Sequence, residues 1–169
     1  IQQRLADAVS MDLPELTERE CRLPEITKKV HSVIGMRRVG KTYFLYQIMK
    51  RCMADGVDRS RLVYFNFEDE RLAGLAVKDL RWIPDEYYVM FPENRSEEVH
   101  FFFDEIQLVD GWERFVRRLL DTETVQIYVS GSSAKMLSRE IASSLRGRSV
   151  EVVIYPYSFR EFAKHHNIE

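Results

Sequence analysis

One eight-residue segment limits the folds open to this chain more than any other feature. The segment Gly35–Thr42, GMRRVGKT, matches the pattern G-x-x-x-x-G-K-[ST] in full. β-branched apolar residues precede it and an amphipathic helical pattern follows it, so it is predicted to join a strand to a helix. Its glycines let successive backbone N–H groups turn inward around a phosphate chain, and the helix dipole adds positive potential. The residues predicted to bind the cofactor are those of this phosphate-binding loop and the residue that follows it: Gly35, Met36, Arg37, Arg38, Val39, Gly40, Lys41, Thr42 and Tyr43.

Two side chains of this loop are expected to carry its chemistry. Lys41 is predicted to reach the β- and γ-phosphates of a bound nucleotide, where its ammonium group offsets their negative charge. Thr42 is predicted to offer its hydroxyl to Mg²⁺, which bridges the same phosphates.

The rest of the chain alternates apolar runs with helical patterns. Strands are predicted at Val30–Ile34, Leu62–Phe67, Val99–Phe103, Val125–Val129 and Val150–Tyr155. Helical spacing of apolar residues follows at Phe44–Cys52, Trp112–Leu120 and Leu137–Leu145. Nearly continuous apolarity favours central parallel strands, so the expected fold is α/β, with three layers and a parallel sheet in the middle.

Two further segments are assigned more coarsely. Residues 1–24 are expected to form a helical lead-in that lies against an edge of the sheet. The stretch from Arg71 to Glu98 is expected to be helix plus loop, broken at Pro84 and Pro92.

An acidic pair stands where the third predicted strand ends. The sequence His100–Glu105, HFFFDE, has the Walker B pattern, an apolar strand followed by carboxylates. Because ligands bind beyond the carboxyl ends of parallel strands, Asp104 is predicted to hold a water ligand of Mg²⁺. Glu105 is predicted to orient and polarise the water that attacks the γ-phosphate.

Two weaker candidates leave alternatives open. The fourth predicted strand ends in small polar residues, among which a hydroxyl of Ser130 or Ser132 is a candidate γ-phosphate sensor. The alternative is an ordinary helix cap. Arg146 and Arg148 flank Gly147 before the last strand and are candidates to stabilise charge on a transferred phosphoryl group, in the same chain or from a neighbour. Their alternative is a solvated turn.

Composition narrows the class of protein. The chain has 169 residues, fits one domain, and carries a formal net charge of −2, which argues against a nucleic-acid coat. DNA stays a candidate partner without support from this charge. No apolar run approaches the length of a bilayer span and no secretory signal is visible, so a cytoplasmic protein is expected. The start at Ile1 and a helix-start signal close to the end suggest a fragment of a longer chain.

The sequence resembles a prokaryotic family of AAA-type P-loop ATPases, in which the ATPase domain is followed by a C-terminal domain of unknown function. The likeness covers most of the chain, with the segments GMRRVGKT, YFNFEDERL, FFFDEIQLVDGWERFVRRLLD, VSGSSAKMLS and SLRGRSVEVVIYPYSFREF. It implies a P-loop NTPase fold with strand order 5-1-4-3-2 and hydrolysis of ATP rather than GTP. It also implies a sensor-like role for Ser130 or Ser132 and an arginine-finger role for Arg146 or Arg148. Met36 departs from the family, where proline is frequent.

The expected function is a Mg²⁺-dependent ATPase coupled to conformational change in an adjoining domain or partner. The alternative is an ATP-dependent switch whose hydrolysis is slow or requires a partner. A homo-oligomer or a protein partner is compatible with both hypotheses, because arginine fingers in this fold often act across subunits.

Overall fold

A computed structural model describes residues 2–24, 26–131 and 145–168. Five parallel strands form one sheet in the order β2-β3-β4-β1-β5. Read from the other edge, this is the predicted order 5-1-4-3-2. The strands are β1 Val30–Gly35, β2 Leu62–Asn66, β3 Val99–Asp104, β4 Val125–Gly131 and β5 Ser149–Ile154. All five predicted strands are therefore confirmed, with ends that differ by one or two residues.

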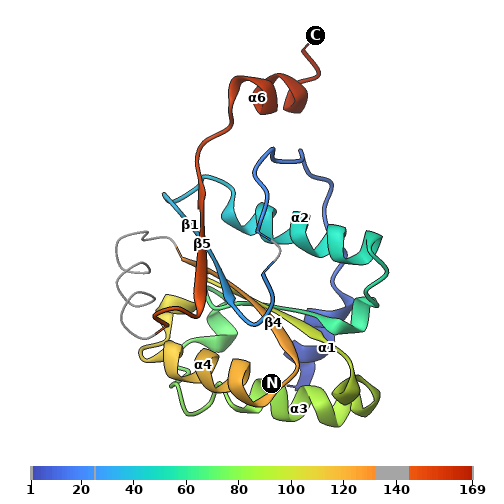
Figure 1. The fold of residues 1–169 in the computed structure, drawn as a ribbon, viewed down its shortest axis with the longest axis vertical. Helices are drawn as coiled ribbons and strands as arrows, with labels where there is room; N and C mark the ends of the chain where they lie inside the picture. Colours follow the sequence, from blue (N-terminus) through green and yellow to red (C-terminus); the bar gives the residue numbers. More distant parts are fainter. Residues whose placement is uncertain (1, 25, 132–144, 169) are drawn as a thin grey trace.

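Helices cover both faces of the sheet, as Figure 1 shows. One face packs against α2, and the other packs against α1, α3 and α4. The helices are α1 Gln2–Ser10, α2 Lys41–Ala54, α3 Trp82–Met90, α4 Trp112–Thr122 and α6 Phe159–His165. Short 3-10 turns connect them at η1 Arg59–Arg61, η2 Glu70–Leu72, η3 Pro92–Ser96 and η4 Ile106–Leu108. The predicted three-layer α/β architecture is confirmed.

The alternation of side chains along β3 decides where its polar end lies. Val99, Phe101 and Phe103 are buried on the α4 side of the sheet. Phe102 is buried on the opposite side, against α2. Successive residues of a strand face opposite sides, so Asp104 falls on the α2 face, near the first turn of that helix.

The N-terminal helix lies against the β2 edge of the sheet, as expected. Its residues Leu5 and Ala8 are buried in the core beside β2 and α3. The Arg59 guanidinium donates to the carbonyl groups of Ala8 and Met11, which fixes the end of the helix. Helix α1 ends at Ser10 and is therefore shorter than the predicted lead-in. The chain that follows it runs past α2 toward α6 (Figure 1).

Proline does not break the segment between β2 and β3 in the expected way. Pro84 lies inside the first turn of α3, where a backbone N–H has no partner within the helix and its loss costs little. Pro92 begins η3 instead. The predicted helix plus loop is confirmed, while the break at Pro84 is not.

The last helix begins at the predicted signal. Ser158 Oγ accepts a hydrogen bond from Glu161 N at 3.2 Å, and Ser158 N donates to Glu161 Oε2 at 2.8 Å. This reciprocal capping box satisfies two backbone donors at the start of α6. The predicted helix at Leu137–Leu145 lies outside the described residues, except for Leu145, which is buried. Within the described part of the chain, no helix is long and apolar enough to cross a bilayer.

Candidate functional site

The loop between β1 and α2 has the backbone that its glycines predict. A Cβ on Gly35 would lie 2.5 Å from the carbonyl oxygen of Ile154, so only glycine allows β1 to approach β5 this closely. Gly40 has φ 93° and Arg38 has φ 65°, both in the left-handed region. Alternation of this kind turns successive N–H groups toward one point, which is the geometry of an anion-binding nest.

Lys41 lies across the loop that precedes it. Its Nζ donates to the carbonyl oxygen of Met36 at 3.1 Å and lies 3.7 Å from Glu105 Oε1. The side chain is only 5% exposed, so this positive charge is held close to the loop. Met36, Arg37 and Arg38 of this loop are exposed, as is Tyr43 in the first turn of α2, while Val39 is buried.

Asp104 is the centre of a buried hydrogen-bond cluster. Its Oδ2 accepts from Thr42 Oγ1 at 2.7 Å and from the Tyr64 hydroxyl at 2.8 Å. Its Oδ1 accepts from the Ser130 hydroxyl. Burial, and then the charge of Asp104, raise the pKa of Tyr64, which keeps its phenol protonated as a donor. The structure thus brings Thr42, Asp104 and Ser130 together, and adds Tyr64, which the sequence analysis missed.

Glu105 turns away from its neighbour through an unusual backbone conformation. Its φ of 54° is left-handed, which costs about 1–2 kcal/mol in a residue with a side chain. Its backbone N–H donates to Ser130 Oγ at 3.1 Å, and its Oε2 accepts from Gln107 Nε2 at 2.6 Å. These contacts aim the Glu105 carboxylate toward Lys41, while Asp104 faces Thr42.

A cavity of about 550 Å³ opens beside the loop. Its walls come from the N-terminal segment, the phosphate loop and the start of the C-terminal segment. They include Glu15, Thr17, Arg19, Met36, Arg37, Arg38, Val39, Gly40, Tyr43, Pro156, Tyr157 and His165. Thr17 Oγ1 and His165 Nδ1 lie 2.7 Å apart, which joins the two terminal segments. The volume lies within the range of small-ligand sites.

Arg19 is a second residue that sequence analysis missed. It is 7% exposed, and its guanidinium bonds to Val39 in the loop, to Tyr155 after β5 and to Glu161 in α6. It stands in an irregular stretch without periodicity or a motif, so no local signal identifies it. Its partners lie 20 and more than 130 positions away in the sequence.

Arg146 and Arg148 do not reach this site within one chain. The carbonyl oxygen of Arg148 accepts from Val30 N at 2.7 Å, which places both arginines beside the first residue of β1. The phosphate loop begins at the other end of that six-residue strand, roughly 17–20 Å away at about 3.3 Å per residue. The Arg148 side chain pairs with Asp121, and Gly147 has φ 73° in an exposed turn. Of the alternatives left open for these arginines, the structure removes an arginine finger that acts within the same chain.

Ser132, the other sensor candidate, lies outside the described residues. The acidic turn after β2 forms its own local contacts, since Asp69 accepts from Arg71 N and pairs with Arg4 and Arg71.

The donor set fits Mg²⁺ bound together with phosphates. Thr42 and Asp104 offer hard oxygen atoms at the end of the loop, and Mg²⁺ usually takes one or two protein carboxylates with substrate phosphates and waters. Over residues 2–24, 26–131 and 145–168, no group of three or more His, Cys, Asp and Glu side chains could hold a metal alone.

Comparison with known proteins agrees with this geometry. A family model described as an AAA domain matches residues 27–163. An uncharacterized protein of Methanocaldococcus jannaschii is 40% identical over 153 residues, which cover 90% of this chain and 32% of that protein. An uncharacterized protein of Haemophilus influenzae is 32% identical over 148 residues, 85% of this chain and 35% of that protein. The chain thus spans about a third of the length of these relatives.

Among solved structures, Caenorhabditis elegans PCH-2 aligns with a TM-score of 0.48 and 14% identity, over 81% of this chain and 37% of that chain. The family match covers most of the chain and includes the loop, the acidic pair and the last strand. The chain belongs to the AAA domain family, and this membership implies nucleotide binding.

Proposed function

We propose that this chain binds and hydrolyses ATP with Mg²⁺, and that the cycle drives a conformational change in an adjoining domain or partner. The observation that carries the proposal is the convergence of four side chains at the carboxyl ends of β1 and β3. Thr42 bonds to Asp104 at 2.7 Å, and Lys41 lies 3.7 Å from Glu105. Opposite charges and hard oxygen donors at one loop suit a bound triphosphate.

Each group has a proposed role that follows from its contacts. The backbone N–H groups of the loop bind the β-phosphate, and Lys41 exchanges Met36 and Glu105 for the β- and γ-phosphates. Thr42, and Asp104 through a water ligand, would hold Mg²⁺, which would neutralise charge on the phosphates. Glu105 orients a water molecule toward the γ-phosphorus and accepts its proton. Ser130 bonds to both Asp104 and Glu105 N and thus holds the two carboxylates apart.

The cavity beside the loop is the proposed nucleoside site. Tyr43 and Tyr157 present aromatic rings on its walls, and Thr17 and His165 add polar atoms. Aromatic faces stack on nucleobases, and polar groups orient them. The sensor role of Ser132 stays a prediction, and Arg146 and Arg148 could act on phosphate only from a neighbouring copy.

The proposal is tested by ATP binding and phosphate release with and without Mg²⁺. Lys41→Ala should abolish tight nucleotide binding, and Glu105→Gln should bind ATP without turnover. Matched controls are Lys50→Ala near the end of α2 and Glu70→Gln in the exposed acidic turn, which should behave like the parent protein. Normal turnover in Glu105→Gln would remove the assigned base, and absence of binding by the parent protein would refute the proposal.

The alternative function is a switch that holds ATP and hydrolyses it slowly or only with a partner. One observation favours it: both Lys41 and Gln107 engage Glu105, the carboxylate proposed to act as the base. Tight binding by the parent protein with no measurable phosphate release would select the switch.

A further inference from the structure

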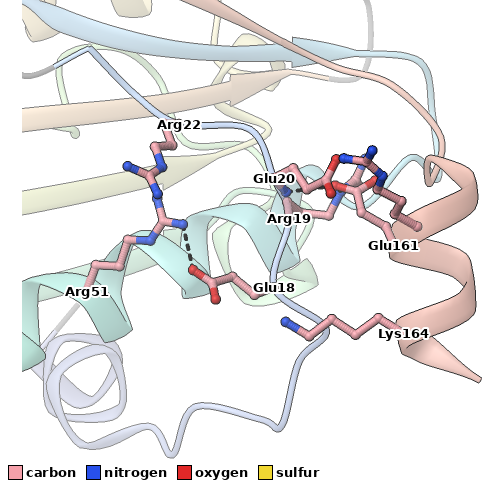
Figure 2. A pocket seen from close by; sticks show the side chains of 8 residues that line it. Glu18, Arg19, Glu20, Arg22, Arg51, Glu161 and Lys164 are labelled. Atoms are coloured by element: carbon pink, nitrogen blue, oxygen red, sulfur yellow. Dashed lines mark hydrogen bonds and ion pairs between the residues drawn. The ribbon is translucent and has the colours of Figure 1, made fainter. Parts of the chain in front are cut away.

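A buried arginine joins the phosphate loop to the last helix. Arg19 Nη1 donates to Val39 O at 3.0 Å, and Arg19 Nε donates to Glu161 Oε1 at 3.0 Å. Its third nitrogen donates to Tyr155 O, and the guanidinium stacks over the Tyr157 ring at 4.7 Å. Figure 2 shows Arg19 and Glu161 pointing toward each other from the N-terminal segment and α6. One planar cation thus contacts three separate parts of the chain.

The main chain of Arg19 is fixed as firmly as its side chain. Arg19 N donates to Gln47 Oε1 at 2.7 Å, and Gln47 Nε2 donates to Arg19 O at 3.0 Å. Gln47 lies in α2, the helix that begins at the phosphate loop, and it is 2% exposed. The guanidinium is therefore preorganised by a helix that is part of the same site.

Glu161 is the residue of α6 that pairs with Arg19. Its Oε1 also accepts from Glu20 N at 2.9 Å, and its Oε2 accepts from Ser158 N. Burial alone would raise the pKa of Glu161, but the bonds from Ser158, Glu20 and Arg19 outweigh it, so the pKa is lowered. A carboxylate that stays ionised here matches the buried cation, since either charge alone would be costly.

The bond to Val39 acts on the phosphate site through peptide geometry. In a planar trans peptide, the C=O of one residue and the N–H of the next point in opposite directions. Arg19 donates to the Val39 carbonyl, and the Gly40 N–H therefore points away from Arg19. A Cβ on Gly40 would lie 3.4 Å from Arg19 Nη1, so the guanidinium also lies near the Gly40 backbone.

We propose that Arg19 is a positioning residue for phosphate binding, which holds the Val39–Gly40 peptide with its N–H toward the phosphates and ties the loop to α6 through Glu161. The inference rests on the proposed function, because it assumes that phosphates bind at this loop. It predicts that nucleotide affinity depends on a contact between α6 and the N-terminal segment, away from the phosphates themselves.

A neighbouring ion pair in the same groove provides the control. Arg51 Nη2 lies 2.7 Å from Glu18 Oε1, and both pairs are visible in Figure 2. The side chains of Arg51 and Glu18 are 37% and 54% exposed, whereas those of Arg19 and Glu161 are 7% and 6% exposed. The bond of Arg51 to Glu18 joins α2 to the N-terminal segment without involving the loop, so loss of this pair should leave phosphate binding unchanged.

The experiment measures the affinity of the parent protein and of Arg19→Lys, Glu161→Gln and Glu18→Gln for ATP and for inorganic tripolyphosphate. A lysine keeps the charge of Arg19 but cannot span three acceptors. Arg19→Lys should weaken both ligands by about tenfold or more, as expected for a charged hydrogen bond. Glu161→Gln should weaken both by a smaller factor, and Glu18→Gln should match the parent protein. Tripolyphosphate separates an effect on the loop from one on the nucleoside cavity, which Arg19 also lines.

A second readout needs no nucleotide. The amide resonance of Gly40 in the ¹H–¹⁵N spectrum should shift in Arg19→Lys and Glu161→Gln, and stay in place in Glu18→Gln.

A lower melting temperature with unchanged affinities and an unchanged Gly40 resonance would show a merely structural role and overturn the inference. Weakened ATP binding with unchanged tripolyphosphate binding would also overturn it. If Arg19→Lys does not fold, Glu161→Gln decides the question by the same criteria. Failure of the parent protein to bind either ligand refutes the proposed function, and with it the inference.

Discussion

Replacement of Glu105 by glutamine should strengthen ATP binding as well as stop turnover. Lys41 Nζ lies 3.7 Å from Glu105 Oε1, and the two side chains are 5% and 11% exposed. At this separation, with an effective dielectric constant near 20, the attraction is about 4 kcal/mol. Incoming phosphates compete with Glu105 for Lys41 and are also repelled by its charge. Both effects oppose ATP binding in the parent protein.

Glutamine keeps the shape of this side chain and removes its charge. If a quarter to a half of that attraction is lost when phosphates bind, the variant should gain about 1–2 kcal/mol, which is roughly 5- to 30-fold in the dissociation constant. The gain should be larger for the triphosphate than for ADP, because the γ-phosphate brings additional negative charge near Glu105.

The assay is calorimetric titration of a non-hydrolysable ATP analogue and of ADP, each with Mg²⁺, into the parent protein and Glu105→Gln. Glu70→Gln, with an exposed carboxylate after β2, is the control for a general change in net charge. Equal or weaker affinity of a folded Glu105→Gln protein for the analogue would refute the argument that Glu105 competes with phosphate for Lys41.

Two further predictions concern stability. Tyr64→Phe removes a buried donor to Asp104 and should lower the free energy of unfolding by about 1.5–3 kcal/mol, or roughly 3–12 °C in melting temperature, whereas exposed Tyr155→Phe should change neither. Burial lowers the pKa of His100, so the unfolded chain takes up its proton first, and stability should fall as the pH drops below about 6.5. Glu98 raises this pKa and Arg61 lowers it, and both effects are smaller than that of burial. His100→Gln should flatten the fall in melting temperature between about pH 7 and pH 5, and exposed His166→Gln should leave it unchanged.

Strand periodicity explains why the fold and much of the site could be predicted. The run Val99–Phe103 carries apolar residues on both faces, with His100 as its polar exception, which is typical of a central parallel strand, and β3 lies between β2 and β4. In such a sheet the residue after the run must emerge at the carboxyl edge, next to the loop that follows β1. The pair Asp104 and Glu105 could therefore be predicted at the candidate site from the sequence alone.

Contacts between distant segments explain what could not be predicted. Arg19 meets Val39 and Glu161 only because the N-terminal segment passes between the phosphate loop and α6. An arginine in an irregular stretch is usually exposed, and nothing local marks one that is buried. Tyr64 could not be predicted for a different reason. An aromatic residue in a strand is normally interpreted as part of the core, and the polar role of its hydroxyl depends on its contact with Asp104.

The arginines before β5 lie away from the phosphate loop for a topological reason that the sequence already contains. In a parallel sheet, the chain that leaves one strand at the carboxyl edge must return to the amino edge before the next strand begins. Segments that follow strands therefore meet the phosphate loop, and segments that precede strands lie at the opposite edge. Arg146 and Arg148 precede β5, and Arg148 sits beside the first residue of β1, as this rule requires. Within one copy of the chain both arginines therefore lie at the edge of the sheet opposite the phosphate loop, and an arginine that acts on phosphate from this turn would have to come from another copy.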